Sequence, residues 1–269
     1  MKAVRVAITG AAGRMGQRLV TLAHQGEHTV VTGASEASGH GKISHDAGLV
    51  AGIGEIGVTI SPDLSHDIGR ADVVIDFSVP EASVRHARLA GEARVPMVIG
   101  TTGLSAAQNA AIAESLSGLP YVQAPNMSVG ITLLLTLLDT AARTLTDEYD
   151  IEIVEMHHRH KIDAPSGTAL RLGEVVARAR GVDLEKDGVF TRHGHTGPRA
   201  RGSIGLQTLR GGDVAGDHLV IFAADGERVE IGHRASGRDT FAMGAIRAAC
   251  WVVGRAPGHY DMQDVLGLR

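Results

Sequence analysis

The first 125 residues alternate short apolar runs with segments of helical periodicity, and this alternation constrains the fold most strongly. The apolar runs are 3–9, 28–35, 71–78, 95–100 and 120–125, and the helical patterns are 13–25, 80–93 and 105–116. Strands that alternate with helices need crossover connections, which give a parallel sheet covered on both faces. Residues 37–57 are glycine-rich and predict an irregular loop. We therefore predict a Rossmann-like, doubly wound α/β domain.

The pattern changes from about residue 128. A long helical segment, 128–145, precedes a strand at 150–158 and a helix at 166–180, and three strands then follow without helices between them, at 201–212, 217–226 and 227–236. Consecutive strands joined by Gly/Asp turns indicate a mixed or antiparallel sheet. We expect a final helix, 239–254, to return to the first domain. The predicted organisation is a dinucleotide-binding domain over 1–128 plus 239–269, and a second α+β domain over 129–238 built on a mixed sheet.

Composition excludes several classes of protein. A formal net charge of -4 with 3% aromatic residues argues against a nucleic-acid partner. The longest apolar runs fall short of the ~20 residues that cross a bilayer, so we expect no membrane partner. The single cysteine, Cys250, allows no intrachain disulfide and lies in an apolar helical stretch. The reducing cytoplasm is the expected compartment.

The segment GAAGRMG, residues 10–16, lies between the first predicted strand and the first predicted helix. Its G-x-x-G-x-x-G spacing is related to the dinucleotide fingerprint, in which glycines allow a tight turn and let a pyrophosphate approach the N–H groups of a helix N-terminus. Such spacing alone is weak in a chain with 35 glycines, but the position in the first βα unit favours a phosphate-binding loop.

An acidic residue at the end of the second strand is the next element of that fingerprint. Glu36 stands twenty positions after Gly16, where a carboxylate would bind ribose hydroxyls. A carboxylate there repels a 2′-phosphate, and Ala37 supplies no compensating guanidinium, although Arg14 in the glycine loop could. We therefore predict NADH as the favoured cofactor, with NADPH also accepted.

Two further segments follow later strands of the same domain. GTTG (100–103) and APNMS (124–128) lie at the carboxyl ends of predicted parallel strands, which is where ligands bind in open α/β sheets. Either could be an ordinary turn. Their matching positions favour a role in lining the nicotinamide side.

A basic cluster, HHRHK, occupies residues 157–161. Histidines bind metals, but the adjacent Arg159 and Lys161 and the lack of cysteine ligands argue against a metal site, and none is predicted. The remaining alternatives are a solvated loop and an anion pocket. Ser166 directly after it is a good helix N-cap, and a helix N-terminus with neighbouring lysine and histidine binds carboxylates. Histidine can also donate a proton near neutral pH. Together with a nicotinamide loop, these features predict a reductase of a small acid.

The chain resembles the 4-hydroxy-tetrahydrodipicolinate reductase family of bacterial lysine biosynthesis. The resemblance covers nearly the whole length and is carried by GAAGRMG, GTTG, APNMSVG, EMHHRHKIDAPSGTAL and GHTGPR in one order. It implies NAD(P)H-dependent reduction of a cyclic dicarboxylate (loosely, dihydrodipicolinate) to tetrahydrodipicolinate with loss of water. It also implies a homotetramer built through the second domains, which would bind substrate.

The resemblance assigns roles to particular residues. It implies that His157 and Lys161 are catalytic proton donors, and that His158, Lys161, Gly167 and Thr168 bind the substrate. The implied cofactor-binding residues are Gly10, Ala11, Ala12, Gly13, Arg14, Met15, Glu36, Gly100, Thr101, Thr102, Ala124, Pro125, Asn126 and Met127. Many family members place an arginine after the ribose acid, so Ala37 is a departure that bears on NADPH use. The alternatives are another amino-acid dehydrogenase and a non-catalytic nicotinamide-binding redox sensor.

Overall fold

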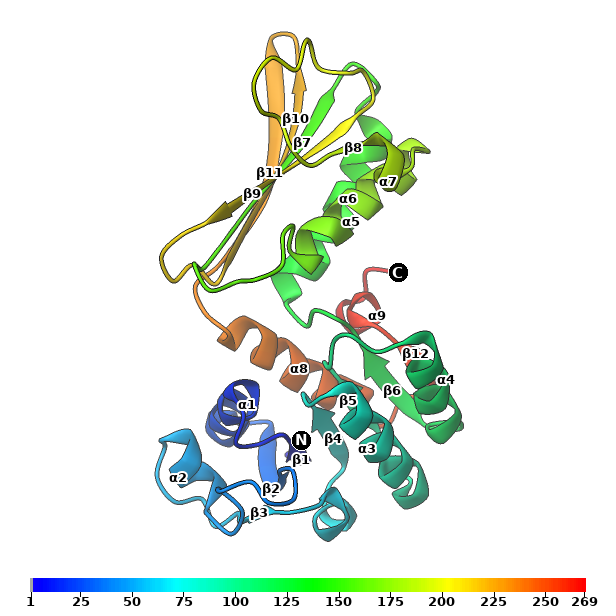
Figure 1. Ribbon diagram of the computed structural model, residues 1–269. Helices are drawn as coiled ribbons and strands as arrows, with labels where there is room; N and C mark the ends of the chain where they lie inside the picture. Colours follow the sequence, from blue (N-terminus) through cyan, green and yellow to red (C-terminus); the bar gives the residue numbers. More distant parts are fainter. Residues whose placement is uncertain (1) are drawn as a thin grey trace. The chain divides into compact units, whose positions relative to one another are not determined.

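The computed structural model describes residues 2–269 and divides the chain into two compact units (Figure 1). One unit takes in the chain up to Val129 together with Arg238–Arg269, and the other covers Gly130–Gly237. The first unit is therefore assembled from both ends of the chain, with the second unit inserted between them.

The first unit is built on a seven-stranded sheet in the order β12-β6-β5-β4-β1-β2-β3, in which every paired strand is parallel. This arrangement confirms the predicted doubly wound sheet. The strands are β1 (Val4–Thr9), β2 (Thr29–Ser35), β3 (Ile60–Ser61), β4 (Val73–Asp76), β5 (Met97–Ile99), β6 (Pro120–Gln123) and β12 (Gly258–Tyr260).

Helices cover both faces of this sheet and bury two separate cores. Val6 and Ile8 of β1 belong to one core, whereas Ala7 between them belongs to the other, because successive side chains of a strand point to opposite faces. The first core is closed by α1 (Arg14–Gln25), α2 (Ala47–Ala51), α8 (Asp239–Val252) and α9 (Met262–Leu266), and the second by α3 (Pro80–Ala93), α4 (Ala106–Ser115) and the short 3₁₀ helices η1 (Leu64–His66) and η2 (Ile68–Arg70).

Two sequence predictions for this unit are wrong. Residues 37–57 are not a wholly irregular loop, because α2 forms within them. The carboxylate of Asp46 caps that helix by accepting from the N–H groups of Gly48 and Leu49, and it also accepts from Ile56 and Val58 farther along. Nor is α8 the final element, since β12 and α9 follow it and β12 extends the sheet beside β6.

The second unit is built on a mixed five-stranded sheet in the order β11-β10-β7-β9-β8. The β7–β9 and β8–β9 pairs are parallel, and the β7–β10 and β10–β11 pairs are antiparallel. This confirms the predicted mixed sheet. The elements are α5 (Val129–Thr144), β7 (Asp150–His157), α6 (Gly167–Arg180), α7 (Leu184–Asp187), β8 (Gly188–Val189), β9 (Ile204–Arg210), β10 (Gly216–Ala224) and β11 (Glu227–Ala235).

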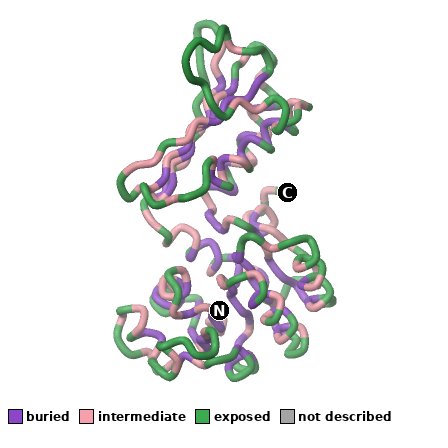
Figure 2. Tube along the Cα trace, viewed as in Figure 1, coloured by how far each residue is buried: buried purple, intermediate pink, exposed green. Residues whose placement is uncertain are grey.

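One face of this mixed sheet packs against α5 and α6 and holds the core of the unit, including Ile153, Val220 and Phe222. Residues on the opposite face, except the buried Gly205, are half-buried or exposed. Figure 2 colours the residues along these strands by burial. We call this opposite face the open sheet face, and its apolar members are Val154, Met156, Leu209, Leu219 and Ile221.

Across residues 2–269, none of the helices combines the length and apolar character that a bilayer crossing needs.

Candidate active site

The glycine loop leads from β1 into α1, and its geometry explains each of the three glycines. Gly10 has a φ of +64°, and a Cβ there would lie 2.9 Å from the carbonyl oxygen of Phe77. Gly13 is the N-cap of α1 and brings no capping side chain. A Cβ on Gly16 would overlap the Gly10 carbonyl. The loop therefore brings the first turn of α1 close to the end of β1. The N–H groups of that helical turn are the ones that can bind an anion.

Glu36 follows the last residue of β2 and reaches the glycine loop. One carboxylate oxygen accepts from the backbone N–H of Ala12 at 3.1 Å, and the other accepts from that of Ala37 at 2.9 Å. The structure thus brings the predicted ribose acid to the predicted phosphate loop. Within that loop Ala11 is buried, Met15 is half-buried, and Arg14 is exposed at the start of α1.

The GTTG segment follows β5, and its first two residues are buried. A Cβ on Gly100 would overlap the ring of Phe77, so only glycine fits there. The hydroxyl of Thr101 points inward, donating to Asp76 at 3.0 Å and accepting from the N–H of Ser78 at 3.0 Å. Thr102 is exposed. Thr101 can therefore offer a ligand its backbone but not its hydroxyl.

Asp76, which holds Thr101, is fully buried at the end of β4. Its carboxylate also accepts from Ser83, from Thr9 at the end of β1 and from Nδ1 of His86, the last at 2.8 Å. Burial alone would raise its pKa, but the His86 pairing and the hydroxyl donors outweigh burial and lower it. This ionised carboxylate links the ends of β1, β4 and β5.

The APNM segment follows β6. The N–H of Ala124 donates to the carbonyl of Ile99 at 3.2 Å, so this segment lies directly beside the GTTG segment. Pro125 is exposed, the side chain of Asn126 accepts from the N–H of Ser128 at 2.9 Å, and Met127 is buried. The structure therefore groups both segments at the carboxyl end of the parallel sheet, as the sequence predicts.

The basic cluster begins at the last residue of β7. Glu155 and His157 are both buried and lie on the same side of the strand, since they are two residues apart. Nδ1 of His157 lies 2.5 Å from Oε2 of Glu155. Arg210, opposite His157 in the β7–β9 pair, donates to both Glu155 oxygens at 2.9 Å. Burial would raise the pKa of Glu155, but the hydrogen bonds from Arg210 and His157 lower it.

His218, opposite Glu155 on β10, is the second buried histidine at this point. Its ring packs edge-on against that of His157, with centroids 5.2 Å apart, and its Nε2 lies 3.3 Å from the hydroxyl of Ser166. Burial, with repulsion from His157, lowers the pKa of His218 to about 4. His218 is therefore neutral at pH 7.

After β7 the chain turns and carries the rest of the cluster toward solvent. His158 is half-buried, its ring centroid lies 6.3 Å from that of His160, and Arg159 and His160 are exposed. Nζ of Lys161 forms an ion pair with Asp163 at 2.9 Å, and this contact lowers the pKa of the Asp163 carboxyl. A substrate carboxylate would compete with Asp163 for the ammonium group.

The N-terminus of α6 follows at once. Ser166 caps it by accepting from the N–H of Ala169 at 3.1 Å, while its own N–H donates to Glu155 at 3.1 Å. Gly167 is exposed and Thr168 half-buried in the first turn. The basic cluster and this helix end thus share Glu155, so the structure brings the predicted substrate residues of this unit together.

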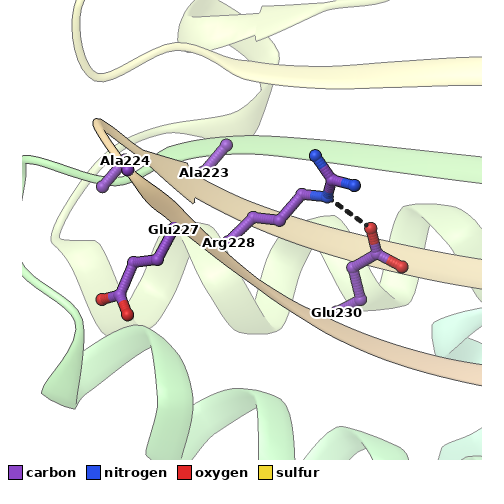
Figure 3. A pocket seen from close by; sticks show the side chains of 6 residues that line it. Ala223, Ala224, Glu227, Arg228 and Glu230 are labelled. Atoms are coloured by element: carbon purple, nitrogen blue, oxygen red, sulfur yellow. Dashed lines mark hydrogen bonds and ion pairs between the residues drawn. The ribbon is translucent and has the colours of Figure 1, made fainter.

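A separate hollow of about 690 Å³ lies at the β10–β11 hairpin (Figure 3), at the other end of β10 from His218. Its lining includes the ion pair between Arg228 and Glu230 at 3.0 Å. None of the predicted site residues lines this hollow. Between residues 2 and 269 no three histidine, cysteine or acidic side chains are grouped so as to hold a metal ion.

Three residues of the basic site are missing from the sequence predictions, namely Glu155, Arg210 and His218. Glu155 carries a local signal, because it alternates with His157 on a strand. Arg210 and His218 lie more than 50 positions farther along the chain and reach the site only through strand register.

Two family models match the chain, one over most of each unit. The family model for the N-terminus of dihydrodipicolinate reductase matches residues 4–127, and the model for its C-terminus matches residues 130–266. The 4-hydroxy-tetrahydrodipicolinate reductase of Pseudomonas fluorescens strain Pf0-1 is 54% identical over 98% of this chain and 99% of the relative. The enzyme of the same name from Pelobacter propionicus is 49% identical over 99% and 100%.

Solved structures agree in fold. A dipicolinate-bound dihydrodipicolinate reductase from Paenisporosarcina sp. TG-14 superimposes with a TM-score of 0.76 at 24% identity, covering 97% of this chain and 98% of that one. An amine dehydrogenase from Mycobacterium smegmatis gives a TM-score of 0.56 at 12% identity, covering 95% and 94%. At these identities the likeness concerns the fold alone.

The sequence relatives decide between the alternatives left open by the residues. They support a pyridine-nucleotide reductase of lysine biosynthesis, and they support neither another amino-acid dehydrogenase nor a redox sensor. With both family models matched and relatives about half identical over nearly its full length, this chain belongs to the dihydrodipicolinate reductase family.

Proposed function

We propose that this chain reduces 4-hydroxy-tetrahydrodipicolinate to tetrahydrodipicolinate with hydride from NAD(P)H, as the names of its relatives indicate. The observation that supports this best is the basic site, where the His157 imidazole and the N-cap of α6 both contact Glu155 and the Lys161 ammonium group lies in the loop between them. A cyclic dicarboxylate needs anion donors for both carboxylates and a proton donor for the charge that hydride addition creates.

The substrate-binding roles fall to residues around α6. We assign one carboxylate to the first turn of α6, where Gly167 offers an N–H and Thr168 an N–H and a hydroxyl. The other carboxylate falls to Lys161, which would exchange its contact with Asp163 for the substrate. His158 is assigned as a further ligand of the ring.

The catalytic roles fall to His157 and Lys161. When bound, the reduced nicotinamide supplies the hydride. His157 and Lys161 supply the proton that the reaction consumes, and the 4-hydroxyl leaves as water. The cofactor loops belong to the first unit and the basic cluster to the second, so each unit is assigned one of the two reactants.

The residues of the first unit fit a dinucleotide. We assign the pyrophosphate to the glycine loop formed by Gly10, Ala11, Ala12, Gly13, Arg14 and Met15, the ribose to Glu36, and the nicotinamide side to Gly100, Thr101, Thr102, Ala124, Pro125, Asn126 and Met127. NADH is the proposed favoured cofactor, because the Glu36 carboxylate repels a 2′-phosphate and Ala37 provides no cation. NADPH is proposed as an alternative cofactor, whose 2′-phosphate Arg14 could bind.

We further propose a homotetramer that buries the open sheet face against a second copy. The apolar side chains of this face include Leu209, which is 49% exposed. Gln207 lies among them, and its Nε2 is buried with no hydrogen-bond partner within residues 2–269. A second copy would cover the apolar residues and could satisfy that amide. The cytoplasm is the proposed compartment, consistent with a lone free Cys250.

A coupled assay tests the proposed function. Purified protein is given the product of dihydrodipicolinate synthase, and oxidation of NADH and NADPH is followed at equal concentrations. We expect turnover with both and a higher kcat/KM for NADH. Absence of turnover with either cofactor refutes the reductase assignment, whereas turnover with a strong NADPH preference refutes only the cofactor assignment.

Substrate placement is tested separately by soaking crystals with pyridine-2,6-dicarboxylate. We expect its carboxylates at Lys161 and at the first turn of α6. A mimic bound away from His158, Lys161 and Thr168 overturns the substrate-binding roles.

A further inference from the structure

Glu155 is 1% exposed, yet both of its carboxylate oxygens are hydrogen-bonded to donors from other residues. Its Oε2 is bonded to Nδ1 of His157 at 2.5 Å and accepts from Nη1 of Arg210 at 2.9 Å. Its Oε1 accepts from Nη2 of Arg210 at 2.9 Å and from the N–H of Ser166 at 3.1 Å. A buried carboxylate with a bidentate guanidinium and a backbone donor stays ionised and stays in place.

This arrangement decides which nitrogen of His157 exchanges protons. An ionised carboxylate can only accept, so Nδ1 of His157 must carry the hydrogen that Glu155 binds. The nitrogen left for chemistry is Nε2. It faces Gly216 on β10, where a Cβ would come within 3.0 Å of it, and the glycine leaves that space open.

The neighbouring histidine is arranged differently. No carboxylate among residues 2–269 forms a hydrogen bond with His218 that would hold a proton on it, and burial keeps it neutral. Its Nε2 lies beside the hydroxyl of Ser166, which already accepts from the N–H of Ala169 and can therefore donate to the ring. Two imidazoles in edge contact thus have opposite surroundings, and only His157 is equipped to hold a proton for transfer.

The same carboxylate also connects the histidine to the anion site. Through Oε1, Glu155 holds the N–H of Ser166, the N-cap of α6. The first-turn donors at Gly167 and Thr168 follow directly. One side chain therefore fixes the proton donor and the start of the proposed carboxylate-binding turn relative to each other.

We propose that Glu155, clamped by Arg210, is a positioning residue that presents Nε2 of His157 to the substrate and ties this histidine to the first turn of α6. This inference rests on the proposed reductase function. In the step concerned, the substrate ring has already lost its 4-hydroxyl as water and gains a C–H bond from the hydride. The electron pair displaced from the ring double bond then forms a bond to the proton as the Nε2–H bond of His157 breaks. His157 is left neutral with Nδ1–H still bonded to Glu155, and solvent returns one proton.

The charged or titratable groups beside His157 are Glu155 on its own strand, Arg210 opposite it on β9 and His218 of β10. Glu155 is the only anion among these three. Replacing it by glutamine removes the negative charge and leaves the cation of Arg210, so the protonated imidazole is disfavoured. The alkaline limb of the kcat profile should therefore move to lower pH in Glu155→Gln.

A double-mutant cycle tests whether Glu155 acts through His157. We expect Glu155→Gln to lower kcat by about 10²-fold, as for a lost general acid. In a His157→Gln background the same change should cost no more than about 3-fold, because residues that act as a unit are not additive. Losses that multiply in the double variant, or an unmoved pH limb, overturn the proposal.

Glu152→Gln is the matched control. Glu152 lies on the same strand and is held by two arginines, Arg192 at 2.7 Å and Arg199 at 3.1 Å, but it is on the opposite face of β7 from His157. The Glu152→Gln variant should have a kcat and a pH profile of kcat close to those of wild type. An equal loss in this control would show that any broken carboxylate clamp on β7 has the same effect, which overturns a specific role for Glu155.

A measurement on the wild-type protein keeps the proposal testable if Glu155→Gln does not fold. Imidazole ¹⁵N NMR, with assignment by His157→Gln, should show Nδ1 of His157 protonated when the ring is neutral. The Nε2–H tautomer overturns the inference without any variant of Glu155. Wild-type protein without turnover refutes the reductase function instead, and the NMR result then decides the role of Glu155 in setting the tautomer.

Discussion

His218 should make the second unit sensitive to acid. Its pKa is lowered from 6.5 to about 4, first by burial and then by repulsion from His157, with His233 and Lys161 acting in the same direction and Glu155 opposing. At a pH between these two pKa values, His218 is protonated in the unfolded chain and neutral in the folded chain. Unfolding is therefore favoured as pH falls from about 6.5 toward 4.

The size of the effect follows from the two pKa values. At pH 5 the histidine of the unfolded chain is almost fully protonated and the folded one is about 10% protonated, which corresponds to about 2 kcal/mol of lost stability. The full difference, reached below pH 4, is about 3 kcal/mol. His218→Gln removes the titration while keeping an amide near Ser166. Between pH 7.5 and pH 5, wild type should therefore lose about 2 kcal/mol more of its unfolding free energy than His218→Gln does.

The assay must report on the second unit. The only tryptophan, Trp251, lies in α8 of the first unit, so its fluorescence follows that unit and serves as an internal control. Hydrogen exchange of β7 and β10 amides in increasing urea, corrected for intrinsic rates at each pH, follows the second. Protein concentration is held fixed, because association changes apparent stability.

Exposed His195, replaced by glutamine, is the matched control for the acid effect and should leave the pH dependence of wild type unchanged. If His218→Gln loses as much stability as wild type between pH 7.5 and 5, the buried neutral histidine is not the source of acid sensitivity and the reasoning fails.

Four further predictions concern separate parts of the molecule. Lys161→Ala should lower kcat and raise KM in steady-state assays, because the ammonium group serves both substrate and transition state; a change in thermal stability alone would make it structural. Ala37→Arg should raise kcat/KM for NADPH by about 10-fold through contact with the 2′-phosphate, and an unchanged ratio would exclude this position from phosphate binding. Gly16→Ala should cost about 3 kcal/mol in urea unfolding of the first unit, because its Cβ overlaps backbone; near-normal stability would contradict the close contact. Leu219→Glu should reduce the assembly to smaller species in sedimentation, and an intact tetramer would place the interface elsewhere.

The sequence predicts most of what depends on local conformation. Gly10 and Gly16 could be located because their spacing reflects a backbone requirement, and Glu36 could be located from its distance along the chain. In the structure, Glu36 is hydrogen-bonded to the loop that contains these glycines. The basic cluster is equally local, since His157, the turn and the cap of α6 are consecutive in the chain.

The remaining features could not be predicted because they depend on tertiary pairing. Arg210 and His218 become neighbours of Glu155 only through the register of β9 and β10 with β7. The helix α2 depends on one carboxylate, Asp46, that collects N–H groups from both sides of the loop. The strand β12 is three residues long and carries no periodic signal.

The position of α8 in the first unit has a consequence for how the chain folds during synthesis. Ala242, Ala245, Ala248 and Ala249 of this helix are fully buried in the core that α1 also contributes to. The ribosome must therefore translate the whole inserted unit before that core can close. At bacterial rates this interval is roughly ten seconds, during which the nascent nucleotide unit presents an uncovered apolar surface that chaperones or aggregation can capture.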